Sequence, residues 1–178
     1  MGFPFISTAD YEYANNFLDR RAGVARKYNH VRGVLKDGSL ERAHDGIDLY
    51  VERGTPVRSV FEGIVINPAR RWRPWDPARY GRTVVVISTE PTSRGYTALM
   101  VHLSRVDVRH GDRVRRGQVV GRTGDTGNAE GVPIHLHFEL RAPFELRLRE
   151  AGRIRHVDAF DPYPSLRAAD PQRPHARR

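Results

Sequence analysis

The sequence has 178 residues, of which 39% are hydrophobic and 29% charged, which is ordinary for one globular domain with a buried core and excludes a wholly disordered chain. The formal net charge is +9, so nucleic acid, anionic wall polymers and anionic lipid surfaces are all partners that the charge would attract. The chain has no cysteine, which excludes disulfides and thiolate metal sites.

The N-terminus does not resemble an export signal. Residues 1–6 lack a basic start and a long apolar core, and no stretch approaches the roughly 18 to 20 apolar residues of a membrane span. Either the protein is not exported, or its signal is not part of this sequence. No nucleic-acid-binding motif accompanies the charge, so we expect no specific nucleic-acid partner, and a biased use of arginine accounts for the charge equally well.

Residues 7–22 are predicted to form a short N-terminal helix within a lead-in segment, residues 1–42. Ser7 and Asp10 resemble a helix cap with an acidic first turn, apolar residues then recur at helical spacing, and Gly23 is a typical stop.

From Gly46 onward, short runs typical of β-strands alternate with turn residues. This pattern predicts a mainly β domain with an antiparallel sheet. The predicted strands span residues 47–51, 57–66, 83–88, 97–103, 118–122 and 134–140.

Two segments between and after these strands are predicted to be irregular. Residues 67–81 are rich in proline and contain both tryptophans, which favours a long surface loop. Trp72 and Trp75 would either stack on a substrate or cover an edge of the core. Residues 167–178 contain four arginines and almost no apolar residue, so a disordered tail is expected.

A His-x-His pair stands in the last predicted strand. Because side chains alternate along a strand, His135 and His137 should share one face, while Leu136 and Phe138 face the core. Two imidazoles would then point into the same space. For an isolated pair, two exposed strand histidines are the more ordinary interpretation.

Two more motifs have residues that could bind a metal or transfer protons at the ends of predicted strands. His44 and Asp48 flank Gly46 where a strand begins, and we expect His44 to fold back over the turn. His102 ends another strand. Catalytic zinc sites use three protein ligands and leave one position open, a requirement that His, Asp and His can meet.

These motifs follow one another in the order seen in a known family. The series His44-x-x-x-Asp48, His102-Leu103-Ser104 and His135-x-His137, with the glycine turns that begin at Gly54 and Gly111, resembles the signature of lysostaphin-type zinc endopeptidases. The resemblance covers about Ala43 to Pro164.

The resemblance implies a zinc endopeptidase domain over residues 43–166. It implies one zinc ion per chain, bound by His44, Asp48 and His137, with His102 and His135 as the catalytic pair. The substrate would be the peptide part of peptidoglycan, in the cell envelope or outside the cell, and anionic wall polymers are a further possible partner. Glu139 would either orient a histidine or be a solvated side chain.

Three other functions agree with some features of the sequence but not with others. An inactive relative that regulates a wall hydrolase would ordinarily lack one or more of the five residues, whereas all five are present. A lipoyl-type carrier needs a lysine at a hairpin tip, but Lys27 and Lys36 both precede the strands. Nucleic-acid binding is supported by charge alone. The bond that is cut and the oligomeric state are left open.

Overall fold

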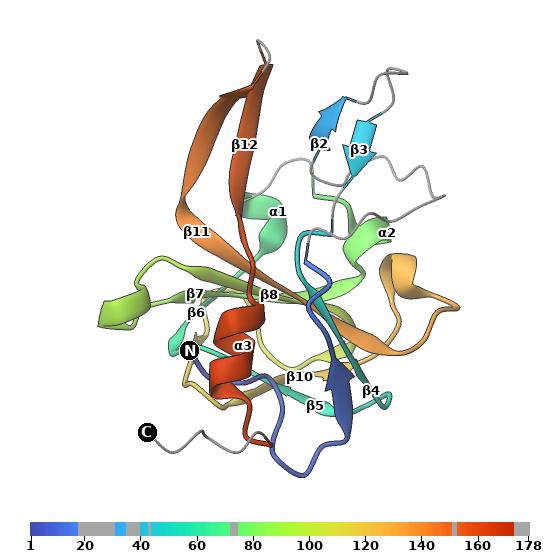
Figure 1. The fold of residues 1–178 in the computed structure, drawn as a ribbon. Coiled ribbons are helices and arrows are strands. Elements are labelled where there is room, and N and C mark those ends of the chain that lie inside the picture. The colour runs from blue at the N-terminus through green and yellow to red at the C-terminus, as the bar shows by residue number, and fades with distance from the viewer. Residues whose placement is uncertain (18–30, 35–39, 43, 72–74, 151–152, 173–178) are drawn as a thin grey trace, which may run out of the picture.

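The structure is a computed structural model that describes residues 1–17, 31–34, 40–42, 44–71, 75–150 and 153–172. Within these ranges most residues with regular structure are in strands, and no helix is long and apolar enough to cross a membrane. The prediction of a mainly antiparallel β domain is therefore confirmed (Figure 1).

One large antiparallel sheet organises the fold. Its strands follow in space as β1 (Tyr11–Tyr13), β4 (Ile47–Val51), β11 (His135–Glu150), β8 (Thr97–Val106), β7 (Arg82–Ser88), β6 (Gly63–Ile66) and β9 (Arg113–Val114). Three more strands attach to this path, since β10 (Val119–Thr123) pairs with both β8 and β5 (Pro56–Arg58), and β12 (Arg153–Phe160) pairs with β11.

Few other elements are present among the described residues. A separate hairpin consists of β2 (Val31–Val34) and β3 (Leu40–Arg42). The helices and 3-10 turns are short: α1 (Pro68–Arg71), α2 (Pro77–Tyr80), α3 (Tyr163–Ala169), η1 (Pro91–Ser93) and η2 (Gly127–Ala129). In Figure 1, β11 and β12 extend together beyond the sheet as a long hairpin.

The centre of the sheet is formed by β4, β11 and β8. Strand β11 lies between the other two, and His137 is opposite both Asp48 on β4 and Val101 on β8. Three segments that are far apart in the sequence therefore meet at one position of the sheet.

The two faces of these central strands have different surroundings. Ile47, Leu49, Leu136 and Phe138 belong to the main hydrophobic core and are fully buried. A smaller apolar cluster contains Val85, Leu99 and Val101, with Trp75 and Tyr80 packed against it. Trp75 therefore covers an edge of the core, as one of the two sequence interpretations had it.

The predicted N-terminal helix is wrong over the described part of residues 7–22. Residues 11–13 form β1, which pairs with the edge of β4, and Tyr11 packs against Phe3 and Phe5 in the core. Pairing with β4 satisfies the backbone donors and acceptors that a helix would have satisfied internally, and burial of the aromatic rings outweighs the helical spacing. Residues 18–22 lie outside the described residues.

Other segments also differ from the prediction. The expected strand 57–66 is divided into β5 and β6, which pair with different neighbours across the turn at Ser59–Glu62. The expected loop 67–81 contains the one-turn helices α1 and α2, and Trp72 lies outside the described residues. The division of the chain at residues 42 and 166 stays a prediction.

The expected disordered tail begins too early. Residues 167–169 belong to α3, and the Asp170 carboxylate accepts hydrogen bonds from the hydroxyls of Tyr11 at 2.6 Å and Tyr13 at 2.9 Å. Burial and these bonds raise the pKa of both tyrosines above the usual value, so the hydroxyls stay protonated and donate. This contact anchors the C-terminal segment to β1. Residues 173–178 lie outside the described residues.

We predict that Asp170→Ala destabilises the fold by about 1–3 kcal/mol, because the buried hydroxyl of Tyr11 loses its acceptor. The measurement is thermal or urea unfolding. Asp107→Ala, which removes only an exposed pair with Arg105, is the control and should change stability little. Equal stability of Asp170→Ala and the unsubstituted chain would contradict this role.

Candidate metal centre

Three side chains converge at the centre of the sheet. Asp48 comes from β4, His137 comes from β11, and His44 comes from the turn before β4. This turn passes so close to β11 that a Cβ on Gly46 would lie 2.3 Å from the carbonyl oxygen of Phe138. Glycine is therefore required where His44 folds back over the turn, as the sequence suggested.

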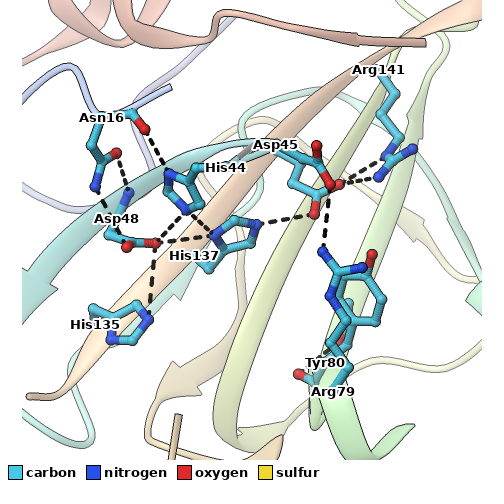
Figure 2. A network of polar contacts seen from close by, with 11 residues as sticks. Asn16, His44, Asp45, Asp48, Arg79, Tyr80, His135, His137 and Arg141 are labelled. Carbon is cyan, nitrogen blue, oxygen red and sulfur yellow. Dashed lines mark hydrogen bonds and ion pairs between the residues drawn. The ribbon is translucent and has the colours of Figure 1, made fainter. Parts of the chain in front are cut away.

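The three side chains bring their polar atoms into mutual contact (Figure 2). His44 Nε2 lies 3.1 Å from Asp48 Oδ1 and 2.9 Å from His137 Nδ1, and His137 Nδ1 lies 3.0 Å from the same carboxylate oxygen. All three residues are at most 8% exposed.

Hydrogen bonds on the outer side of each ring determine which nitrogens face inward with a lone pair. His44 Nδ1 donates to the backbone oxygen of Asn16 at 2.8 Å, and His137 Nε2 donates to Glu139 at 3.0 Å. With the outer nitrogens protonated, the inner nitrogens of the neutral rings are acceptors. Three buried lone-pair atoms that converge in this way can bind a metal ion. Two imidazole nitrogens and one carboxylate oxygen, without thiolate, suit zinc among other divalent metals.

The electrostatics of the site also favour a positive charge between these groups. Burial opposes ionisation of Asp48, but His137 and His44 donate to it when their inner nitrogens carry a proton, and these hydrogen bonds hold the pKa of its carboxyl well below the usual range. Burial likewise opposes a charge on His137, yet Asp48 and Glu139 outweigh it and raise the pKa of this ring to about 9. A metal ion would compete with a proton for this place.

Two further histidines border the same space. His135 Nδ1 donates to the backbone oxygen of Pro133 at 2.8 Å, and His102 Nδ1 donates to that of Thr126 at 2.9 Å. The rings meet edge to face, with centroids 5.1 Å apart. Burial and the neighbouring histidines lower the pKa of His102 to about 3, so its ring is neutral, and with Nδ1 donating to Thr126 its Nε2 is a hydrogen-bond acceptor.

A layer of buried charges lies behind His137. Glu139 is fully buried and also binds the guanidinium of Arg141, while Arg79 on α2 donates to Asp45 at 3.4 Å. Burial opposes ionisation of Glu139, but Arg141, His137 and Arg79 outweigh it and hold its pKa below the usual value. A charged Glu139 therefore fixes the orientation of His137.

The structure brings together all five residues singled out in the sequence: His44, Asp48, His102, His135 and His137. Their separate roles stay predictions. The alternative of two exposed strand histidines is wrong, because His135 is 9% and His137 8% exposed.

Sequence reasoning missed the residues that surround these five. For Glu139 the sequence allows either an orienting role or a solvated side chain, although its position two residues after His137 on one strand is the signal that places both on the same face. Asn16 lies in the segment that the sequence predicts to be helical. Its backbone binds His44, and its side-chain oxygen accepts from the backbone N–H of Asp48 at 3.2 Å. No pattern in the sequence signals this long-range contact.

The model of peptidase family M23 matches residues 42–151. Glycyl-glycine endopeptidase ALE-1 of Staphylococcus capitis is 29% identical over 126 residues, which cover 71% of this chain and 30% of the relative. DD-carboxypeptidase/endopeptidase Mpg of Neisseria meningitidis is 35% identical over 129 residues, 72% of this chain and 25% of the relative.

The solved structure of lysostaphin from Staphylococcus simulans matches with a TM-score of 0.54 and 25% identity, covering 75% of this chain and 50% of that chain. This chain spans less than a third of the length of the two curated relatives, since the matched part is 30% of one and 25% of the other.

We predict that replacing His44, Asp48 or His137 by Ala abolishes stoichiometric binding of a divalent metal, because two ligands do not hold the ion against water. Elemental analysis after loading with Zn²⁺ or Co²⁺ measures this. His110→Ala, which removes an exposed histidine beside Asn67, is the control. Full occupancy in all three variants would show that the metal binds elsewhere.

Glu139→Gln should keep the shape of the side chain but weaken metal affinity by about tenfold or more, since the carboxylate that orients His137 becomes neutral. Competition with a chelator gives the dissociation constant. Glu130→Gln, an exposed position on the neighbouring loop, should leave that constant unchanged. The same constant for Glu139→Gln and the unsubstituted chain would argue against this role.

Proposed function

The chain belongs to peptidase family M23, and from this premise we propose that it is a zinc-dependent endopeptidase that hydrolyses peptide bonds in bacterial peptidoglycan. The observation that carries the proposal is the convergence of His44, Asp48 and His137 at 2.9–3.1 Å, with His102 and His135 at the border of the same space. Three metal ligands with two further imidazoles beside them suit metal-assisted hydrolysis of an amide.

The proposed roles of the metal and of the two remaining histidines follow from the hydrogen bonds of the site. When bound, zinc supplies a water of lowered pKa and polarises the carbonyl that is attacked. His102 and His135 each keep one nitrogen bound to a backbone oxygen and present the other to the site. One ring takes the proton of the attacking water, and a protonated ring then hydrogen-bonds the developing oxyanion or protonates the leaving amine.

The substrate class is proposed from the relatives. ALE-1 is named a glycyl-glycine endopeptidase, and Mpg a DD-carboxypeptidase/endopeptidase. Both names describe cleavage of amide bonds, which suits a site that needs only a carbonyl and an extended peptide. The aromatic ring of Tyr50 lies beside His135, with ring centroids 5.8 Å apart, and is 41% exposed, so it offers a contact surface for such a peptide.

We place this activity in the cell envelope or outside the cell, where peptidoglycan is found. The net charge of +9 would also attract anionic wall polymers. The alternative, an inactive relative that binds and regulates a wall hydrolase, would release no peptides from purified peptidoglycan.

His102→Ala and His135→Ala should each retain one zinc ion per chain but lose about a hundredfold or more in turnover, as expected for general acid-base groups. Zinc content and hydrolysis rate are measured on the same preparation, with His110→Ala as the control. Near-normal turnover in either variant would remove that residue from the mechanism.

The proposed function is tested by mass spectrometry of muropeptides released by the zinc-loaded protein from cell walls with and without glycine cross-bridges. New glycine termini would identify cleavage within a bridge, and loss of directly cross-linked dimers would identify cleavage between stem peptides. Release of no fragment from any wall would contradict the proposed function and favour the inactive relative.

A further inference from the structure

The end of α2 is in direct backbone contact with the loop before η2. Gly81, which follows α2, has φ 62° and ψ −149°, a conformation that essentially only glycine adopts. A Cβ on Gly81 would lie 2.4 Å from the carbonyl carbon and from Oγ1 of Thr126, and a Cβ on Gly127 would lie 2.4 Å from Gly81 N. No side chain fits between the two segments.

Thr126 links this contact to the proposed catalytic histidine. Its hydroxyl donates to the carbonyl of Leu103 at 2.8 Å and accepts from the backbone N–H of Arg82 at 2.9 Å. Its own carbonyl accepts the Nδ1–H of His102. The residue thus connects the end of α2, the start of β7 and the strand position next to His102.

His102 needs such support because its backbone is strained. Its φ of 65° is the only positive value found for a non-glycine residue in the described part of the chain. The register between β7 and β8 shifts at this position. A left-handed backbone is unfavourable for a residue other than glycine, and it persists only where neighbouring contacts determine it.

Helix α2, which ends just before Gly81, is itself held at both of its ends. Asp76 caps its first turn by accepting from the backbone of Ala78 and Arg79. Arg79 reaches Asp45, next to the ligand His44, and Tyr80 stacks on Trp75 with ring centroids 4.3 Å apart. Because these contacts hold α2 in place, the close contact of Gly81 with Thr126 constrains the position of Thr126.

We propose that α2 positions His102 for catalysis through Gly81 and Thr126. Helix α2 and Gly81 are then part of the working site, beside the cover that Trp75 provides over the core edge. The inference rests on the proposed function insofar as it concerns turnover, but the position of the His102 ring can be measured without substrate.

The test compares Thr126→Val, which keeps the shape and loses both hydroxyl bonds, with Thr126→Ser, which keeps them. Zinc content, kcat and KM are measured together with the NMR signal of the His102 Nδ1–H proton, assigned by its absence in His102→Ala. We expect Thr126→Val to bind one zinc ion, keep KM, lose about tenfold or more in kcat and lose this signal. Thr126→Ser should restore both.

A second pair of variants separates positioning from backbone strain. Gly81→Ala and Gly111→Ala both place a side chain at positive φ, but a Cβ at Gly111 meets nothing within 4 Å. Both should lower Tm, and only Gly81→Ala should lower kcat and alter the His102 signal.

The positioning role is overturned if Thr126→Val keeps both kcat and the N–H signal, or if Thr126→Ser loses as much as Thr126→Val. If the unsubstituted protein hydrolyses no peptidoglycan while Thr126→Val still loses the signal, the proposed function fails and the positioning role stands.

Discussion

The structure is arranged around three buried acceptor atoms that approach one another within 3.1 Å: His44 Nε2, Asp48 Oδ1 and His137 Nδ1. When both rings are neutral, the lone pairs of these atoms repel one another, and burial removes the water that would otherwise separate them. A cation between them turns the repulsion into attraction. The pairing of β11 with β4 on one side and β8 on the other brings these groups to the same place.

The histidines of the site differ in the group that accepts a hydrogen bond from the outer ring nitrogen. His137 donates to a carboxylate, Glu139, which makes the ring more basic and a better ligand, whereas His102 donates to a neutral carbonyl. Burial with that neutral partner leaves the pKa of His102 low, and burial beside two carboxylates leaves that of His137 high. His44 and His135 also donate to backbone oxygens, so the backbone determines which nitrogen of these rings faces the site.

The buried charged residues behind the site connect the sheet to helix α2. Arg141 compensates Glu139 from the same strand, and Arg79 compensates Asp45 from α2. Buried charges of this kind are stable only when each is paired, so the layer favours one arrangement of α2 over others. The closeness of α2 to Thr126 then makes the geometry of His102 depend on a segment that contains no proposed ligand or base.

Sequence alone determined the parts of this site that depend on local periodicity. Alternation along a strand predicted that His135 and His137 share a face opposite Leu136 and Phe138, and Gly46 predicted the turn that returns His44 towards Asp48. Tertiary structure decided the strand pairing and the long-range contacts, which local periodicity does not predict. Residues 11–13 became a strand because the edge of β4 was available to pair with them, and Asn16, Thr126 and Arg79 entered the site through contacts with residues distant in the chain. Such contacts depend on how the strands are ordered in the sheet, which no local pattern of residue types records.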